Sequence, residues 1–285
     1  MNLTSAPQIK QLLANYGLRP KKRLGQNFLI DRNVLTRLVD ATGAGPDSRV
    51  LEIGPGLGVV TRELAQIGAK VVCVEADKDL APILNEVLKE QSNVEIVIAD
   101  FLKVAIADLT GSDREKWIVV GNLPYYITTP IIIRLIDAKR LVSSIFLMVQ
   151  REVAQRLQAE PGSEDYGAIT VFVQYHCEIE SIMKVSRNVF YPIPDVDSEL
   201  IRLVIRDNPK VEIRDEGLFF RIVRAAFGKR RKTLLNALST SEELGWDREI
   251  AQAALDGAGI DAGRRGETLS LEEFGKISDA GVDRI

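Results

Sequence analysis

The segment "RVLEIGPGLGVVTRELAQIGAKVVCVEAD", residues 49–77, decides the fold. A short β-branched run leads into a glycine-rich turn, a helix-like run follows, and a second β-branched run completes the unit. This order is typical of a β-α-β unit, in which two parallel strands flank a crossover helix. Ligands of such sheets bind beyond the carboxyl ends of the strands, so the turn after residue 53 is the first candidate site.

The same alternation continues along the chain. Runs rich in β-branched residues predict strands at 49–53, 70–75, 94–99, 117–121, 144–149, 168–180 and 198–206. Together they predict an α/β fold with a doubly wound, mostly parallel, Rossmann-like sheet of seven strands. After Pro209 the β-branched runs stop and short helices are expected. We therefore expect a catalytic domain over residues 1–208 and a small all-α domain over residues 209–285.

Composition narrows the classes of function. The chain has 285 residues, 46% of them hydrophobic and 27% charged, as in an ordinary globular protein. It shows neither a signal-peptide pattern nor an apolar run long enough to cross a bilayer, so we expect a cytoplasmic protein without a membrane partner. A single histidine, His176, disfavours Ser-His-Asp chemistry and leaves little basis for a metal site.

Three features at successive strand ends predict a nucleoside cofactor. Glycines at 54, 56 and 58 follow the first strand, Glu75 ends the second and Asp100 follows the third. Val59 stands where the dinucleotide fingerprint has its last glycine, which argues against a pyrophosphate-containing cofactor. Glu75 can accept from two ribose hydroxyls, and Asp100 from an adenine amino group. The alternative is that these glycines only form a turn. The arrangement resembles the class I S-adenosylmethionine-dependent methyltransferases.

The fourth strand ends in Asn-Leu-Pro-Tyr, residues 122–125. The Asn122 side chain and the Leu123 carbonyl could accept the two amino hydrogens of an adenine, which makes the lone pair of that nitrogen available. Pro124 would hold the backbone, and Tyr125 could stack on the base. Such chemistry needs no strong base and depends on positioning. The alternative is a plain turn with Tyr125 and Tyr126 in the core.

Seven stretches resemble one family of enzymes, the KsgA-type rRNA adenine N6-dimethyltransferases, which are relatives of the Erm resistance methyltransferases. The stretches are "KKRLGQNFLID" (21–31), "LEIGPGLGVVT" (51–61), "VEAD" (74–77), "GNLPYYITTPII" (121–132), "QREVAQRL" (150–157), "VFYPIPDVDS" (189–198) and "AFGKRRKTLLNAL" (226–238). They span nearly the whole chain, and "GQNFL", "NLPYYITTP" and "RRKTLLNAL" are specific to this superfamily.

The resemblance implies roles for particular residues. Cofactor contacts fall on Asn27, Leu29, Gly54, Glu75, Asp100 and Asn122, with Gln26 and Phe28 in the segment that closes over the cofactor. Contacts to the target adenine fall on Asn122, Leu123, Pro124, Tyr125 and Phe190. It further implies that two adjacent adenosines in a hairpin near the 3' end of small-subunit rRNA are each methylated twice, within a partly assembled 30S subunit. We expect a monomer.

The net charge of −3 argues weakly against a nucleic-acid partner, but cations cluster locally. The candidate phosphate-binding residues are Arg221, Arg224, Lys229, Arg230, Arg231 and Lys232. The alternative is a solvated charged face.

Three other functions compete with this interpretation. An Erm-type enzyme would use the same motifs on large-subunit rRNA, although "AFGKRRKTLLNAL" favours the small-subunit branch. An assembly factor without catalysis would not need an intact Asn-Leu-Pro-Tyr. A nicotinamide oxidoreductase is disfavoured by Val59.

Overall fold

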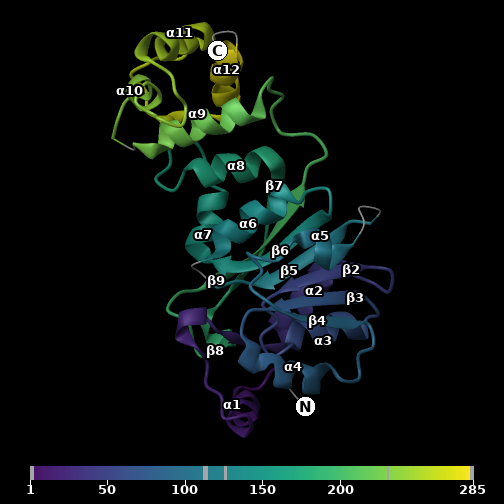
Figure 1. Ribbon diagram of the computed structural model, residues 1–285. Coiled ribbons are helices and arrows are strands. Elements are labelled where there is room, and N and C mark those ends of the chain that lie inside the picture. Colours follow the sequence, from purple (N-terminus) through teal and green to yellow (C-terminus); the bar gives the residue numbers. More distant parts are fainter. Residues whose placement is uncertain (1–2, 112–114, 125–126, 230, 283–285) are drawn as a thin grey trace. The chain divides into compact units, whose positions relative to one another are not determined.

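The computed structural model describes residues 3–111, 115–124, 127–229 and 231–282. It contains a seven-stranded sheet with strand order β4-β3-β2-β5-β6-β9-β7 (Figure 1). The strands are β2 (Arg49–Ile53), β3 (Lys70–Glu75), β4 (Val94–Ile98), β5 (Trp117–Asn122), β6 (Val142–Gln150), β7 (Cys177–Val185) and β9 (Ser198–Ile205). β2 to β6 pair in parallel, whereas β9 runs antiparallel to β6. The predicted fold class is confirmed.

The helices that lead into or connect the parallel strands have capping residues or glycines at several of their ends. They are α2 (Arg32–Thr42), α3 (Val59–Gln66), α4 (Ala81–Leu88), α5 (Ile106–Thr110) and α6 (Thr128–Asp137). Asp31 caps α2 by accepting from the Val34 amide, and Gly43 ends that helix in the left-handed conformation. Because β2, β3, β4 and β5 pair in parallel, their carboxyl ends lie at one edge of the sheet.

The N-terminal segment belongs to the same core. Helix α1 (Ala6–Asn15) buries Ile9, Leu12 and Leu13. Further along, β1 (Phe28–Leu29) pairs antiparallel with β8 (Phe190–Tyr191), so two segments far apart in sequence lie side by side. The apolar residues of α1, β1 and β8 join one hydrophobic cluster with those of β2 and α3.

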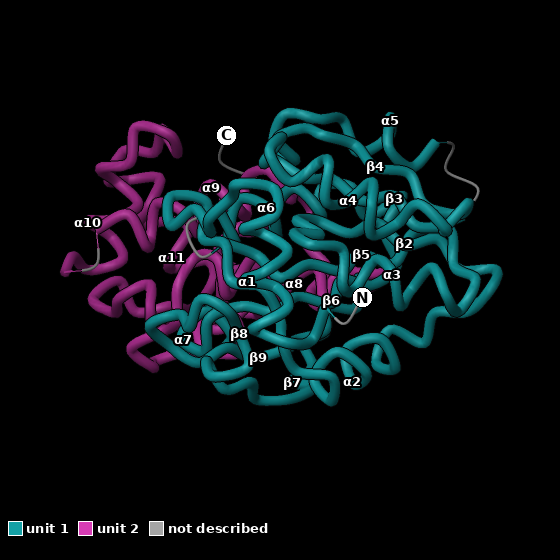
Figure 2. Tube along the Cα trace, turned by 90° about the horizontal axis from the view of Figure 1, so that it is seen from below, with its two compact units in different colours: residues 1–154, 178–205 teal, residues 155–177, 206–285 magenta. Residues whose placement is uncertain are grey.

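Two compact units divide the chain (Figure 2). The first comprises residues 1–154 and 178–205, and the second comprises residues 155–177 and 206–285. The second unit contains α8 (Ala168–His176), α9 (Glu216–Gly228), α10 (Leu234–Leu238), the short η5 (Gly266–Thr268), α11 (Arg248–Ala258) and α12 (Leu271–Val282). Residues 155–177 therefore group with the C-terminal helices, whereas the sequence placed them in a continuous domain ending at 208.

The strand predicted at 168–180 is wrong over its first nine residues. Residues 168–176 form α8, and only from Cys177 does the chain enter β7. Five of the nine helical residues are buried, including Tyr175 and His176. A helix covered on several sides lacks a polar stripe, so its β-branched composition looks like a strand.

Within the described residues, no helix is both long and apolar enough to span a membrane.

Candidate active site

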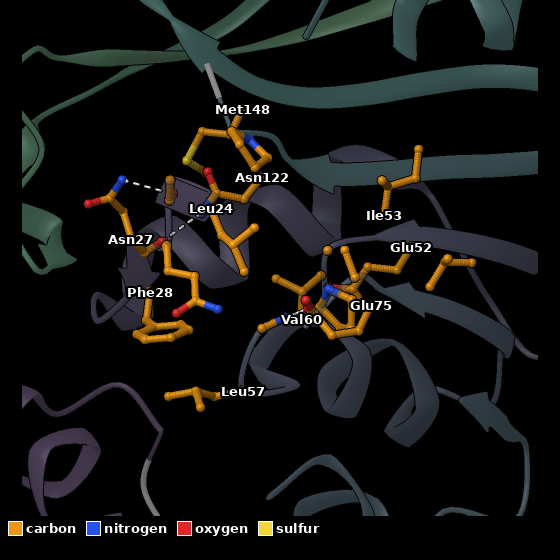
Figure 3. Close-up of a pocket in the computed structure, with 18 of the residues that line it drawn as sticks. Leu24, Asn27, Phe28, Glu52, Ile53, Leu57, Val60, Glu75, Asn122 and Met148 are labelled. Carbon is orange, nitrogen blue, oxygen red and sulfur yellow. Dashed lines mark hydrogen bonds between the residues drawn. The ribbon is translucent and has the colours of Figure 1, made fainter. Parts of the chain in front are cut away.

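A cavity of about 1140 Å³, counting its part open to solvent, lies at the carboxyl ends of β2 to β5. Figure 3 shows Glu52 and Glu75 toward one end of it and Asn27 and Asn122 toward the other. Among the residues predicted from the sequence, the lining contains Gln26, Asn27, Phe28, Leu29, Gly54, Gly56, Glu75, Asp100, Asn122 and Pro124. The strand-end residues are therefore brought together as expected.

The glycine turn lets the chain bend tightly under this cavity. Gly54 and Gly56 have φ of +70° and +58°, which side-chain-bearing residues rarely adopt. A Cβ on Gly54 would meet nothing within 4 Å, so its backbone borders open space. A Cβ on Gly56 would stand 3.1 Å from the Phe28 ring. Gly58 does not line the cavity, because it begins α3 and packs against Leu84 of α4.

Glu75 is buried at the end of β3. Its two carboxylate oxygens accept from the Gly56 amide at 3.1 Å and the Asp77 amide at 2.8 Å. Burial raises the pKa of Glu75, although these two backbone hydrogen bonds oppose the shift. A backbone hydrogen bond from Ala76 acts in the same direction as these two. A carboxylate has about four lone-pair positions, so Glu75 keeps acceptor capacity for a ligand.

Glu52 is a second buried carboxyl group of the lining. Its Oε2 accepts from the Thr61 hydroxyl at 2.5 Å, which ties β2 to α3. Burial raises the pKa of Glu52 to about 7, and the nearby Glu75 charge acts in the same direction. The sequence placed Glu52 beside the glycine turn but did not include it among the predicted site residues.

Asp100 follows β4 and is less enclosed. Its Oδ1 accepts from the Leu102 amide at 3.0 Å, and its side chain is 47% exposed. Lys103 lies 3.8 Å from Oδ2. Asp100 therefore presents an acceptor at the rim of the cavity.

Asn122, the last residue of β5, has a defined orientation. Its Nδ2 donates to the Asn27 carbonyl at 3.0 Å, which leaves Oδ1 as the acceptor end of the amide. Asn27 Nδ2 donates in turn to the Gly25 carbonyl at 3.1 Å, as the dashed lines in Figure 3 show. A Cβ on Gly25 would stand 2.9 Å from Pro124 Cβ, so the two backbones are in close contact. The segment around residues 25–27 thus supports the Asn-Leu-Pro turn.

Leu123, Phe190 and Tyr125 were also predicted to contact the target adenine. Leu123 is buried and does not line the cavity, which is compatible with a role for its carbonyl alone. Phe190 is only 2% exposed and also lies outside the lining, because β8 pairs with β1 and its ring joins the core. Tyr191 beside it is half-buried. Tyr125 lies outside the described residues.

An ionic network centred on the buried Asp77, which the sequence did not predict, lies beside the cofactor side of the cavity. The Asp77 side chain is 4% exposed and accepts from Lys21 Nζ at 2.5 Å and from Gln26 Nε2 at 2.7 Å. Lys21 Nζ also pairs with Asp79 at 2.6 Å. Burial favours the protonated form of Asp77, but the hydrogen bonds from Lys21 and Gln26 prevail and lower its pKa. "VEAD" contains Asp77, yet nothing in one sequence identifies its partners.

The predicted phosphate-binding residues lie on and after α9 in the second unit. Arg224 forms an ion pair with Glu243, and Lys229 donates to the Thr240 hydroxyl at 3.0 Å. Lys229, Arg231 and Lys232 are exposed, whereas Arg221 is half-buried and Arg230 lies outside the described residues. The sequence showed few acids near this cluster, but folding brings Glu243 to it.

Within the described residues, no group of His, Cys, Asp and Glu side chains is arranged to hold a metal ion. The sheet order, the glycine turn after β2 and the acid that ends β3 define the class I methyltransferase fold. The chain belongs to the ribosomal RNA adenine dimethylase family, which it matches over residues 17–279. It is therefore an enzyme of the methyltransferase class, and the family resemblance found in the sequence is confirmed.

Individual relatives support this assignment over nearly the full length. The ribosomal RNA small subunit methyltransferase A of Bacillus cytotoxicus is 46% identical over 98% of this chain and 97% of its own. The protein of the same name from Bacillus cereus is 45% identical over the same shares.

Two solved structures share the fold. The 23S rRNA methyltransferase ErmE is 31% identical, with a TM-score of 0.65 over 89% of this chain and 99% of that one. A dimethyladenosine transferase from Plasmodium falciparum is 23% identical, with a TM-score of 0.74 over 87% of this chain and 95% of that one.

Proposed function

We propose that this protein is the S-adenosylmethionine-dependent enzyme that dimethylates N6 of two adjacent adenosines near the 3' end of small-subunit rRNA. The observation that carries the proposal is the oriented Asn122 amide at the rim of a cavity that also contains Glu75. The naming of relatives that are 46% identical over nearly their whole length supports the small subunit as the substrate.

The acceptor groups of the cavity fit S-adenosylmethionine. Glu75 offers acceptor positions suited to two ribose hydroxyls, and Gly54 borders the open space beside them. Asp100 offers an exposed acceptor for the adenine amino group of the cofactor. The cofactor supplies an electrophilic methyl group on a sulfonium, and the protein's part is to hold both reactants in line.

On the substrate side, the chain supplies acceptors rather than a base. Asn122 Oδ1 and the Leu123 carbonyl accept hydrogen bonds from the two N–H groups of the target amino group. These hydrogen bonds draw its nitrogen toward tetrahedral geometry. The lone pair is then directed at the methyl group, and the product loses its extra proton without a strong base. Pro124, held by Gly25, keeps the turn in place.

A base inside a hairpin must leave its stack to reach this cavity. Tyr125 stacks on one face of the flipped adenine. We assign the other face to the Phe190–Tyr191 pair, whose half-buried member is Tyr191. Stacking on Phe190 itself requires that β1 separate from β8, since their pairing buries that ring.

The partner is small-subunit rRNA inside a partly assembled 30S subunit, and the protein acts as a monomer. Exposed cations Lys229, Arg231 and Lys232 support a phosphate contact in the second unit.

The test compares the parent protein with Asn122→Ala, using small-subunit particles that lack the modification and a cofactor with a labelled methyl group. We expect the variant to lose at least about 10²-fold in transfer rate while it still binds RNA, because a well-placed acceptor is worth that much. Mass spectrometry of the rRNA assigns the position. Methylation of large-subunit rRNA instead would indicate an Erm-type enzyme, and transfer by the variant at the parent rate would refute the acceptor mechanism.

A further inference from the structure

We infer that Lys21 and Asp77 are positioning residues, which form a latch that couples the ribose-binding end of the cavity to the orientation of Asn122. The inference rests on the proposed function, because it gives Asn122 the acceptor role. The latch connects the chain after Glu75 with the N-terminal segment 21–27, and both belong to the first unit.

One end of the coupling is at Glu75. The Asp77 amide donates to Glu75 Oε1 at 2.8 Å, so the backbone that carries Asp77 also fixes the carboxylate assigned to the ribose. Asp77 Oδ1 further accepts from the Asp79 amide at 3.2 Å. A shift of the Asp77 loop therefore moves a direct ligand-binding group.

The middle of the coupling is an ionic network in which the Asp77 carboxylate is buried and its partners are partly exposed. Lys21 Nζ bridges Asp77 at 2.5 Å and Asp79 at 2.6 Å, and Gln26 Nε2 reaches the second oxygen of Asp77 at 2.7 Å. Within the segment, the Lys21 amide donates to Gln26 Oε1 at 2.8 Å. Because the Asp77 side chain is 4% exposed, removing its cationic partner leaves a charge with little access to water. The segment is thus held at two points on one carboxylate.

The other end is at the catalytic turn. Immediately after Gln26, the Asn27 carbonyl accepts from Asn122 Nδ2 at 3.0 Å, and Gly25 packs on Pro124. An asparagine amide presents either an acceptor or a donor, depending on which way it is turned. The Asn27 carbonyl accepts only a donor, so it fixes Nδ2 toward itself and Oδ1 away. If segment 21–27 moves, Asn122 loses the group that distinguishes its two ends.

The test is Lys21→Met with Lys78→Met as the matched control. Lys78 is an exposed cation next to Asp77, so its replacement makes the same charge change one residue from the latch. Single-turnover methyl transfer is measured with cofactor and small-subunit particles both saturating, and cofactor dissociation is followed by stopped flow. We expect Lys21→Met to slow transfer at saturation by about tenfold or more and to speed cofactor dissociation. We expect Lys21→Arg to bring the transfer rate and the rate of cofactor dissociation most of the way back to the parent values. Lys78→Met should match the parent in both rates.

A double-mutant cycle with Asp77→Asn gives a second, independent test of the latch. Because Lys21 and Asp77 act as one unit, the double variant Lys21→Met/Asp77→Asn should transfer no more slowly than the worse single variant. If the loss of transfer rate in the double variant equals the product of the losses in the two single variants, the two residues act independently and the latch is refuted. Lys21→Met transferring at the parent rate once cofactor saturates would also refute it, since that leaves Asn122 correctly oriented. If the parent itself does not methylate the particles, the proposed function fails instead, which separates the two outcomes.

Discussion

Glu52 and Glu75 show how surroundings differentiate two carboxyl groups at neighbouring strand ends. Glu75 receives two backbone amides, which favour its charged form and make it a suitable ligand for hydroxyls. Glu52 has a hydroxyl partner in Thr61 and is 3% exposed, so its charge is poorly compensated. We assign Glu75 to binding and Glu52 to the connection between β2 and α3.

A dependence of stability on pH follows from Glu52. Its pKa is about 7 in the folded protein against an ordinary 4.5, so the folded state holds the proton more tightly than the unfolded state does. The free energy of unfolding contributed by this group therefore falls as pH rises from about 4.5 to about 7, and is constant above. Glu52→Gln removes this pH dependence. From pH 5 to pH 8, the free energy of unfolding of the variant should therefore rise by up to about 3 kcal/mol relative to that of the parent.

Urea denaturation of both proteins at pH 5 and pH 8 measures this difference. Glu95→Gln is the control, because Glu95 lies on β4 with an exposed side chain. A stability difference between Glu52→Gln and the parent that is equal at both pH values would show that Glu52 ionises normally.

At the scale of elements, α12 depends on a glycine. A Cβ on Gly281 would lie 2.5 Å from the ring of Trp246, which is 4% exposed. Although alanine favours helix over glycine, overpacking against a buried ring costs more. Gly281→Ala should therefore lower the free energy of unfolding by about 1–3 kcal/mol. Thermal unfolding followed by circular dichroism measures it.

The matched control is Gly228→Ala at the end of α9, where an added Cβ meets nothing within 4 Å. This substitution should leave stability unchanged or slightly improved. Equal melting temperatures for Gly281→Ala and Gly228→Ala would mean that α12 and Trp246 separate easily.

The sequence predicted those elements whose local pattern agrees with their place in the fold. β2, β3, β4, β5 and β9 were predicted within a residue at each end, because the strands of a largely covered sheet need β-branched runs. Glu75, Asp100 and Asn122 were found since strand ends converge wherever the sheet is parallel. The helix at 168–176 was missed, because burial on several sides removes the periodicity that identifies a helix.

Contacts between distant segments lie beyond such reasoning. Lys21 and Asp77 are 56 residues apart, and their pairing is set by the complete fold. The pairing of Phe28 with Tyr191 is likewise set by the complete fold. Phe190 was expected to be available to a base, and the strand that covers it could not be foreseen from local sequence.

At the scale of the whole molecule, a chain of net charge −3 must bind RNA through a local surface. Arg231 and Lys232 are exposed, whereas Arg224 already pairs with Glu243. Arg231→Glu/Lys232→Glu should therefore weaken binding to small-subunit particles. The slope of log affinity against log salt should also become shallower, by a little under one unit for each lost phosphate contact.

Filter binding across a salt series tests this prediction, and cofactor affinity by calorimetry should stay at the parent value. Lys89→Glu/Lys139→Glu carries the same charge change on exposed residues of the first unit and serves as the control. An equal salt slope in the basic-cluster variant and the parent would place the RNA contact elsewhere.

The chain leaves the first unit after residue 154, returns to it at residue 178 and leaves it again after residue 205. This order has a consequence for folding during synthesis. The nascent chain makes α8 before β7 and β9 exist, yet Tyr175 of α8 stacks on Phe219 of α9, which comes later still. The first unit is complete once residue 205 has emerged, whereas the aromatic face of α8 waits until α9 is made. Domains generally fold as soon as their residues have emerged. A nascent chain whose residues up to 205 have emerged, but whose α9 has not, therefore carries a finished sheet with an uncovered apolar helix, the kind of surface that chaperones bind.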